Sequence, residues 1–373
     1  MTGHCDSAEE AYRRPVNDRF FTFVRHQCFR SRTTLVCVMT VCSLRAAMAG
    51  ESVKPDDTSP AADVIKSAVE KSLPLLVKGA QGSMEKRKNC FTCHNQALPV
   101  LALTTARTRG FAIDAEVLRG QLEFTAGFLE KNRSGYLEGR GQGGQADTAG
   151  TALWTLENGG WKPDATTAAV TEYLLRWQTD LEHWKPQSRR PPTEQSSFTS
   201  RFVALRGLKA FGTPEQRERI DRRIAQVQKW LLKSPAGDTE DRVSRLRALH
   251  VSDAPPDDIR NAAQELLVTQ RADGGWAQLA DMESDAYATA TALVALHTAG
   301  GLPTSGPSWR KGLRYLLTTQ LADGSWRVKT RSEPIQTYYE SGYPHGGDQF
   351  ISISAASWAT TALALALPAE VAK

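Results

Sequence analysis

Two cysteines and a histidine lie within five residues of one another, in a spacing that can hold an iron-containing cofactor. Cys90, Cys93 and His94 form the pattern C-x-x-C-H, by which c-type haem is attached to proteins. Two thiols three positions apart can add to the two vinyl groups of one haem, and the adjacent imidazole then lies beneath the iron as an axial ligand. The sequence therefore predicts haem c on Cys90 and Cys93, with His94 ligating the iron.

The second axial ligand is not determined by the motif. His345 in the segment YPHGGDQF is the leading choice, because it lies in a glycine-bearing loop before the last helix-like segment. Closure of the chain into a ring would bring that segment beside the first one. Met84 and Met282 are the alternatives, and the simpler interpretation of His345 is an ordinary loop histidine.

The same three residues allow other chemistry. Cys90 and Cys93 could form a disulfide or a redox pair, and zinc could bind Cys90, Cys93 and His94, although a fourth protein ligand is missing. Cys93 and Gln96 also have the spacing in which a thiolate can displace ammonia from a glutamine amide to form an internal thioester. In that spacing the segment resembles the thioester domains of complement-like proteins and macroglobulins. Gln96 is more simply an amide at the start of a helix.

The first 49 residues have the pattern of an export signal. Three arginines, Arg25, Arg30 and Arg32, precede an apolar run at 33–44, and Ala47-Met48-Ala49 supplies a cleavage site. The run is shorter than the roughly 20 residues that span a bilayer, so no stable membrane span is expected after cleavage. We therefore expect a periplasmic or secreted protein. The remaining cysteines all lie in this segment: Cys5, Cys28, Cys37 and Cys42.

The charge balance excludes an electrostatic argument for nucleic acid. The formal net charge is +5, and seven arginines with four acids in residues 1–49 account for +3 of it. The remainder carries only +2 and has no basic run with interleaved aromatic residues, which nucleic-acid binding would favour.

Internal repeats indicate the fold. The segments from Asn261 to Trp276 and from Lys311 to Trp326 lie 50 residues apart and share L-L-x-T-Q-x-A-D-G-x-W. A degenerate copy runs from Tyr173 to Trp184, and a weaker one starts at Lys71. Strand-like alternation is nearly absent, so the sequence predicts an all-α protein after a linker at 50–60.

Six helical hairpins account for residues 61–370. The first helices are expected near 62–79, 115–131, 165–178, 214–233, 257–270 and 307–320. Their partners are expected near 95–109, 147–158, 198–211, 240–250, 285–299 and 352–367. The partner helices are rich in Ala, Ser and Thr, which allow close packing, so they should form an inner ring inside the charged first helices. The hairpins therefore predict an α/α toroid, with an open solenoid as the alternative.

The segment from Lys311 to Trp326 resembles the QW motif of squalene/hopene cyclases, with Gly312, Tyr315, Gln320 and Gly324 in the expected places. The resemblance implies the toroid of the terpenoid cyclase and protein prenyltransferase family. In that family the glutamine caps the following helix and the tryptophan stacks on neighbouring repeats. These are structural roles, so they support the fold more than an activity.

The resemblance leaves catalysis open. Cyclases of this family protonate an alkene with a D-x-D-D acid, and the chain has no such tetrad; Asp257 and Asp258 lie at a helix start, where acids stabilise the dipole. Prenyltransferases of this fold hold zinc with Asp, Cys and His, which is not reproduced. Three aspartates at the starts of inner helices could line the ring as acids or act as N-caps: Asp147, Asp285 and Asp348.

Three functions follow from these observations. The first is an exported toroid with haem c, acting in electron transfer with a redox partner or binding an apolar small molecule. The second is a cyclase- or prenyltransferase-type enzyme without the usual acid. The third is a non-catalytic scaffold with a disulfide or zinc clip. An apolar cavity lined by acids would favour the enzyme, whereas an empty or filled ring centre would favour the scaffold.

Overall fold

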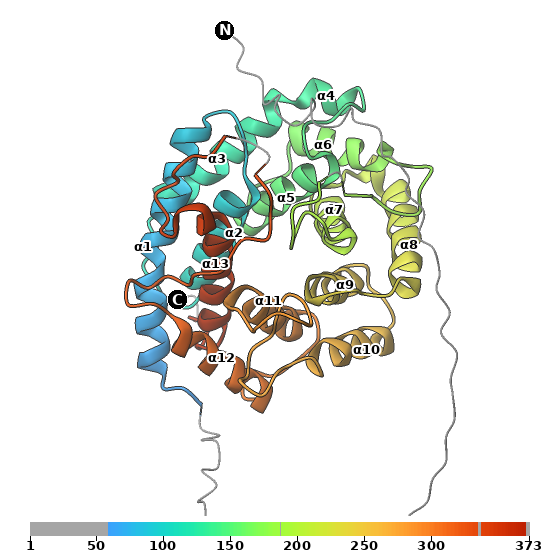
Figure 1. The fold of residues 1–373 in the computed structure, drawn as a ribbon. Helices are drawn as coiled ribbons and strands as arrows, with labels where there is room; N and C mark the ends of the chain where they lie inside the picture. Colours follow the sequence, from blue (N-terminus) through green and yellow to red (C-terminus); the bar gives the residue numbers. More distant parts are fainter. Residues whose placement is uncertain (1–58, 187, 335–336, 371–373) are drawn as a thin grey trace, which may run out of the picture.

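The computed structural model describes residues 59–186, 188–334 and 337–370, which form one helical assembly without a β-strand (Figure 1). The expected export signal, most of the expected linker and the four leader cysteines lie outside these residues. None of the helices described is long and apolar enough to cross a membrane.

Twelve helices alternate between an outer and an inner layer. The outer helices are α1 (Ala62–Arg87), α3 (Ala115–Lys131), α6 (Ala165–Arg176), α8 (Arg217–Lys233), α10 (Pro256–Leu267) and α12 (Pro307–Thr319). The inner helices are α2 (Leu98–Arg107), α5 (Gln145–Asn158), α7 (Ser197–Phe211), α9 (Thr239–Val251), α11 (Ala286–Thr298) and α13 (Gln349–Leu365). The connections between these helices contain four shorter helical segments: the π-helical η3 (Cys93–Ala97), α4 (Arg133–Leu137), η4 (Pro214–Gln216) and η5 (Gly346–Asp348). The inner helix α13 packs against both α11 and α2, which closes the ring (Figure 1). The predicted all-α toroid of six hairpins is confirmed, and the open solenoid is excluded.

Small residues allow the inner helices to pack closely. Gly150 of α5 lies against α7, where an added Cβ would come within 2.8 Å of Val203 Cγ2 and 2.9 Å of the Ala204 backbone nitrogen. A larger side chain would therefore separate the two helices. Helices α11 and α13 are buried along almost their whole length, whereas the outer helices bury one face.

Glutamines of the repeated segments connect each repeat to the next outer helix. Gln270 Nε2 donates to the carbonyl of Ser308 in α12 at 2.8 Å, and Gln320 Nε2 donates to the carbonyl of Ala68 in α1 at 2.8 Å. The second bond joins the last repeat to the first. The Gln320 side chain therefore links the two ends of the chain across the closure of the ring.

The tryptophans of the same segments anchor each loop to its own repeat. Trp276 and Trp326 are buried, and their indole N–H groups donate to the carbonyls of Leu266 at 3.1 Å and Leu316 at 2.8 Å. Each loop is thereby held over the end of the outer helix that precedes it.

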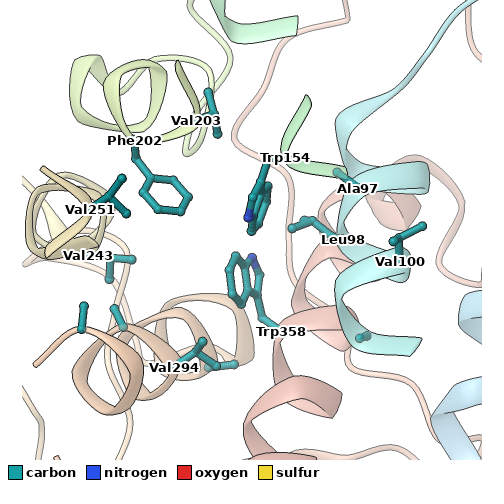
Figure 2. Close-up of a cluster of buried hydrophobic side chains, with 14 of the residues drawn as sticks. Ala97, Leu98, Val100, Trp154, Phe202, Val203, Val243, Val251, Val294 and Trp358 are labelled. Carbon is teal, nitrogen blue, oxygen red and sulfur yellow. The ribbon is translucent and has the colours of Figure 1, made fainter. Parts of the chain in front are cut away.

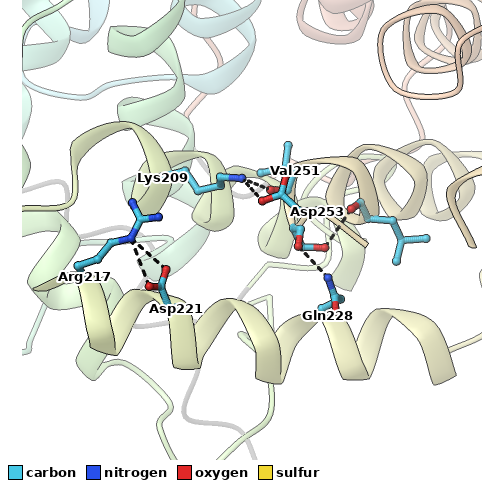
Figure 3. Close-up of polar contacts among 8 residues, drawn as sticks. Lys209, Arg217, Asp221, Gln228, Val251 and Asp253 are labelled. Carbon is cyan, nitrogen blue, oxygen red and sulfur yellow. Dashed lines mark hydrogen bonds and ion pairs between the residues drawn. The ribbon is translucent and has the colours of Figure 1, made fainter. Parts of the chain in front are cut away.

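The two ends of the ring differ. Apart from the short connection before α9, the long connections lie at the end where the inner helices begin, and the shorter ones lie at the other end. At the short-turn end, Lys209 Nζ bonds the Val251 carbonyl at 2.9 Å and the Asp253 carboxylate at 2.6 Å, while Gln228 Nε2 donates to the Ser252 carbonyl at 2.7 Å (Figure 3). These bonds fix the end of α9 against α7 and α8.

Candidate active site inside the helical ring

Aromatic side chains fill the middle of the ring. Trp154 of α5 and Trp358 of α13 stack with ring centroids 6.1 Å apart, and Phe202 of α7 meets the edge of Trp154 at 5.6 Å (Figure 2). Leu98 and Val294 extend this apolar wall from α2 and α11 (Figure 2). The wall offers π-faces that can stabilise a cation. It also fills the ring at this level, as the scaffold alternative expects.

A guanidinium lies among these rings. Arg247 of α9 is 3.8 Å from the ring centroid of Phe202, 4.8 Å from that of Trp358 and 5.1 Å from that of Trp154. Burial lowers the pKa of Arg247 to about 9, and the nearby Arg206 adds to this effect. The side chain nevertheless stays charged at neutral pH.

A buried carboxyl group lies two turns earlier on the same helix. Glu240 is in the first turn of α9, and its oxygens accept hydrogen bonds from Thr199 Oγ1 at 2.6 Å, Tyr287 Oη at 2.9 Å and Ser244 Oγ at 3.3 Å. Burial raises the pKa of Glu240, against the opposing effect of the bonds from Thr199 and Tyr287. A carboxyl group in such a setting can hold a proton and deliver it to a bound molecule.

Glu240 belongs to a tetrad that sequence reasoning missed. Asp238, Thr239, Glu240 and Asp241 read D-x-E-D, which differs from D-x-D-D by one methylene group at the third position. Asp238 caps α9 by accepting a bond from the Asp241 backbone at 2.9 Å, and Asp241 in turn accepts a bond from Ser196 Oγ at 2.7 Å. A search that allowed Glu at the third position would have found the segment.

Two of the three aspartates suggested by the sequence have clear structural roles. Asp285 caps α11 by accepting a bond from the Ala288 backbone at 2.9 Å, and burial raises the pKa of its carboxyl group. Asp348 bonds Arg327 at 3.0 Å and the Thr330 backbone at 2.9 Å, and so holds the loop before α13.

The third aspartate, Asp147, lies close to the C-x-x-C-H segment. It is buried in the first turn of α5, and its charge contributes to raising the pKa of Cys93. Burial is the main cause of that shift, which takes the pKa of the Cys93 thiol to about 12, while a hydrogen bond with Thr151 acts in the opposite direction. Cys93 is therefore a protonated, weakly nucleophilic thiol.

The two cysteines of the motif are not joined to each other. Cys93 carries a free thiol, whereas Cys90 is disulfide-bonded. An intramotif disulfide is thus absent from this segment as the structure describes it. Covalent haem attachment would need both thiols, so the bond at Cys90 would have to open first.

His94 is the one motif residue whose chemistry suits a metal ligand. Its ring packs against Phe350 with centroids 4.9 Å apart, and its Nε2 atom is buried without a hydrogen-bond partner. Burial lowers the pKa of His94 to about 3, and the charges of Arg190 and Arg87 add to this effect. The imidazole is therefore neutral, as ligation of haem iron requires.

The expected second ligand, His345, lies just before α13 and has partners of its own. His345 Nε2 is 2.8 Å from Ser325 Oγ, and its ring meets Tyr343 at 6.2 Å. Within the described part of the chain, no contact joins His345 to His94. Met84 and Met282, the alternatives to His345, are both partly buried.

The other cofactor alternatives gain no support from the contacts. Gln96 Oε1 accepts bonds from the Thr92 backbone at 2.9 Å and from Thr92 Oγ1 at 2.6 Å, so its amide holds the start of the inner helix. Among the residues with described positions, no three His, Cys, Asp or Glu side chains converge in a way that could hold a metal ion such as zinc.

No family model matches this sequence, and no curated protein matches it significantly. Solved structures do match the fold. The apo structure of type II terpene cyclase MstE from Scytonema is 15% identical, covers 82% of this chain and 99% of its own, and has a TM-score of 0.52. A variant of MstE in complex with geranylgeranyl dihydroxybenzoate is 14% identical, with the same coverage and a TM-score of 0.52. A protein from Actinoplanes is 14% identical over 81% of this chain and 99% of its own, with a TM-score of 0.50. The chain therefore has the fold of a type II terpene cyclase.

Proposed function

We propose that the protein is a type II cyclase-like enzyme that protonates an alkene of an apolar isoprenoid inside the ring, with Glu240 as the acid. The observation that carries the proposal is the Glu240 carboxyl group, buried and held by Tyr287 and Thr199. The MstE structure with geranylgeranyl dihydroxybenzoate suggests a substrate of comparable chemistry.

The proposed step transfers one proton. The Glu240 O–H bond breaks and a C–H bond forms at one alkene carbon, which leaves a carbocation on the neighbouring carbon and a carboxylate on Glu240. A second alkene of the substrate attacks the cation and closes a ring. A C–H bond then breaks and its proton passes to water, which gives an isomer of the substrate, and a proton from water restores the acid form of Glu240. The raised pKa of Glu240 favours the proton-bearing form before the step, and the bond from Tyr287 Oη stabilises the carboxylate after it.

Aromatic side chains on the inner helices suit an apolar substrate. Trp154, Phe202 and Trp358 contact one another and the guanidinium of Arg247, about two helical turns along α9 from Glu240. His94 and Arg247 lie deep inside the protein yet both retain accessible surface, which indicates open space beside them. Entry of a substrate into that space would require the aromatic side chains to adjust.

The test is product analysis in heavy water. Purified protein would be incubated with geranylgeranyl dihydroxybenzoate or squalene in D2O, with products analysed by mass spectrometry. We expect a cyclic isomer that carries one deuterium from the acid, and a rate loss of about 100-fold or more in Glu240→Gln. Glu172→Gln is the matched control, because the Glu172 carboxylate also accepts side-chain hydrogen bonds, from Gln216 at 3.2 Å and Arg219 at 2.8 Å, but lies on the outer helix α6. Equal losses in both variants, or no turnover by the wild type, would refute the role of Glu240.

A c-type haem on Cys90, Cys93 and His94 is the second candidate, favoured by the neutral imidazole of His94 with its unpartnered Nε2. When bound, the haem would supply electron transfer, and export to the periplasm would place the chain where such attachment occurs. A pyridine haemochrome spectrum of exported protein is the test. Covalent haem that is lost in Cys93→Ala would support this candidate, and its absence from folded, exported protein would exclude it.

A further inference from the structure

We infer that the ring binds the anionic end of its ligand, a carboxylate or a phosphate, at the guanidinium of Arg247. The inference deepens the proposed function, from which it takes the apolar body of the ligand. The evidence for this anion site does not depend on Glu240. It is that the N–H groups of Arg247 have no acceptor among the described residues, and that aromatic rings surround the guanidinium.

The donors of Arg247 are unused. A guanidinium has five N–H donors in its plane, and stacking on aromatic rings satisfies its faces but not these edges. Among the described residues, Arg247 donates no hydrogen bond and forms no ion pair. The neighbouring Arg206 differs, because its Nη2 lies 2.6 Å from Glu157 Oε1 and its Nε donates to Glu157 Oε2 at 2.8 Å.

A second arginine shows what a structural guanidinium looks like in this fold. Arg223 also lies over an indole, 4.5 Å from the ring centroid of Trp184. It donates to the carbonyls of Leu181 at 2.7 Å and Gln178 at 3.1 Å. Arg247 has the aromatic contacts without the carbonyls, so stacking alone does not explain its place in the ring.

Glu240 does not neutralise Arg247. Its two oxygens already accept three hydroxyl bonds, and none of the bonds comes from the guanidinium. Burial shifts the pKa values of both groups towards their neutral forms, and the attraction between the two charges opposes this shift only in part. The guanidinium of Arg247 is only partly covered by its neighbours. Its N–H groups are therefore open to the oxygens of a ligand, which they can bind in charge-assisted hydrogen bonds.

The geometry defines the ligand class. A guanidinium binds carboxylate and phosphate oxygens in a two-point fork, and Trp154, Phe202 and Trp358 suit an apolar chain beside it. Arg247 and Glu240 are seven residues apart on α9, which is about 10 Å along the helix at 1.5 Å per residue. The inferred ligand is therefore an isoprenoid with one anionic end at Arg247 and an alkene further along the chain that Glu240 can reach.

The test compares three probes that share one chain: geranylgeranoic acid, geranylgeranyl phosphate and geranylgeraniol. Dissociation constants would be measured by calorimetry on the folded wild type. Charge-assisted hydrogen bonds should make at least one of the anionic probes bind about 10- to 100-fold more tightly than the alcohol. The tighter of the acid and the phosphate identifies which oxyanion the site takes.

Variants assign the preference to Arg247. Arg247→Met should bind anion and alcohol equally, and Arg247→Lys should keep the charge but lose most of the preference that depends on the fork. The matched control is Arg245→Met on the same helix, because Arg245 bonds the Leu231 carbonyl at 3.1 Å and Glu265 at 2.8 Å outside the aromatic enclosure. Circular dichroism would verify folding, and Arg247→Lys decides the matter if Arg247→Met does not fold.

Failure of this inference can be told apart from failure of the proposed acid. Equal affinity of the wild type for anionic and neutral probes, no binding of any probe, or a preference that survives in Arg247→Met would each overturn the anion site. Glu240→Gln should keep the preference while losing turnover. A wild type that prefers the anions but makes no product would remove the proposed acid chemistry and leave the anion site standing.

Discussion

The buried imidazole of His94 makes folding stability depend on pH in a direction that can be worked out. In the unfolded chain the imidazole has a pKa near 6.5, whereas burial lowers its pKa in the folded protein to about 3. Between these values the unfolded state binds a proton that the folded state does not. Stability is therefore fully present above about pH 6.5 and is lost as pH falls towards 3.

The magnitude follows from these two values. Between pH 7 and pH 5, the proton taken up by the unfolded state lowers the free energy of unfolding by about 2 kcal/mol. His94→Leu removes this loss. It also removes the buried Nε2 atom that has no partner, and it keeps an apolar contact with Phe350.

Urea unfolding of the wild type and His94→Leu at pH 7 and pH 5 measures the effect. Other titrating groups act on both proteins alike, so the difference between the two isolates His94. We expect the wild type to lose about 2 kcal/mol relative to the variant over this interval. His250→Leu, at an exposed position of α9, is the control for removal of an imidazole. If the free energy of unfolding changed with pH in the same way in the wild type and His94→Leu, burial would not lower the pKa of His94 in the folded protein.

Three further predictions concern the seam of the ring, the thiol and the acid. Gly324→Ala should lower the free energy of unfolding, measured with urea, by about 2–4 kcal/mol. Gly324 has φ +91°, and an added Cβ would lie 2.5 Å from the Lys71 carbonyl oxygen. Gly347→Ala, with open space around it, should leave the free energy of unfolding nearly unchanged in the same assay. Cys93, with its pKa of about 12, should react with iodoacetamide at pH 8 at least about 100-fold more slowly in the native than in the urea-unfolded protein, and rapid native labelling by intact mass would contradict this. Burial raises the pKa of Glu240, so ionisation of this group costs stability as pH rises above its usual value of 4.5. As pH rises from 5 to 8, Glu240→Gln should therefore gain thermal stability relative to the wild type. A relative loss would show that hydrogen bonds compensate the carboxylate for its burial.

The fold could be predicted because its signals are local and repeated. Gln270 and Gln320 recur with the same neighbours at a fixed interval, and each makes the same bond to the next outer helix. Helices rich in small residues alternate along the chain with helices that carry charged residues, and this alternation assigns each helix to the inner or the outer layer. Closure of the ring by Gln320 and Ala68 follows from the number of repeats rather than from any one residue.

The site was harder to predict because it depends on which face of each inner helix points inward. Helix α9 reads TEDRVSRLRALHV, a charged segment without a clear apolar face, so Glu240 and Arg247 look like surface residues. Their spacing of seven places both on one face of the helix, a relation that has meaning only once that face is known to be inside the ring. The C-x-x-C-H motif, in contrast, is recognisable from its spacing alone, without knowledge of the fold.

The titratable side chains discussed above lie at one end of the ring, and the fold explains why. A toroid of hairpins places the starts of all six inner helices at the same end, and helix dipoles make that end attractive to carboxylates. Asp147, Glu240 and Asp285 all lie at such starts, as do Cys93 and His94. Burial opposes the dipoles there: it raises the pKa of Glu240 and Asp285, lowers that of His94 and keeps Cys93 protonated. The same enclosure thus keeps the motif thiol and imidazole uncharged and favours the protonated form of Glu240, which is the form that the proposed protonation of an alkene requires.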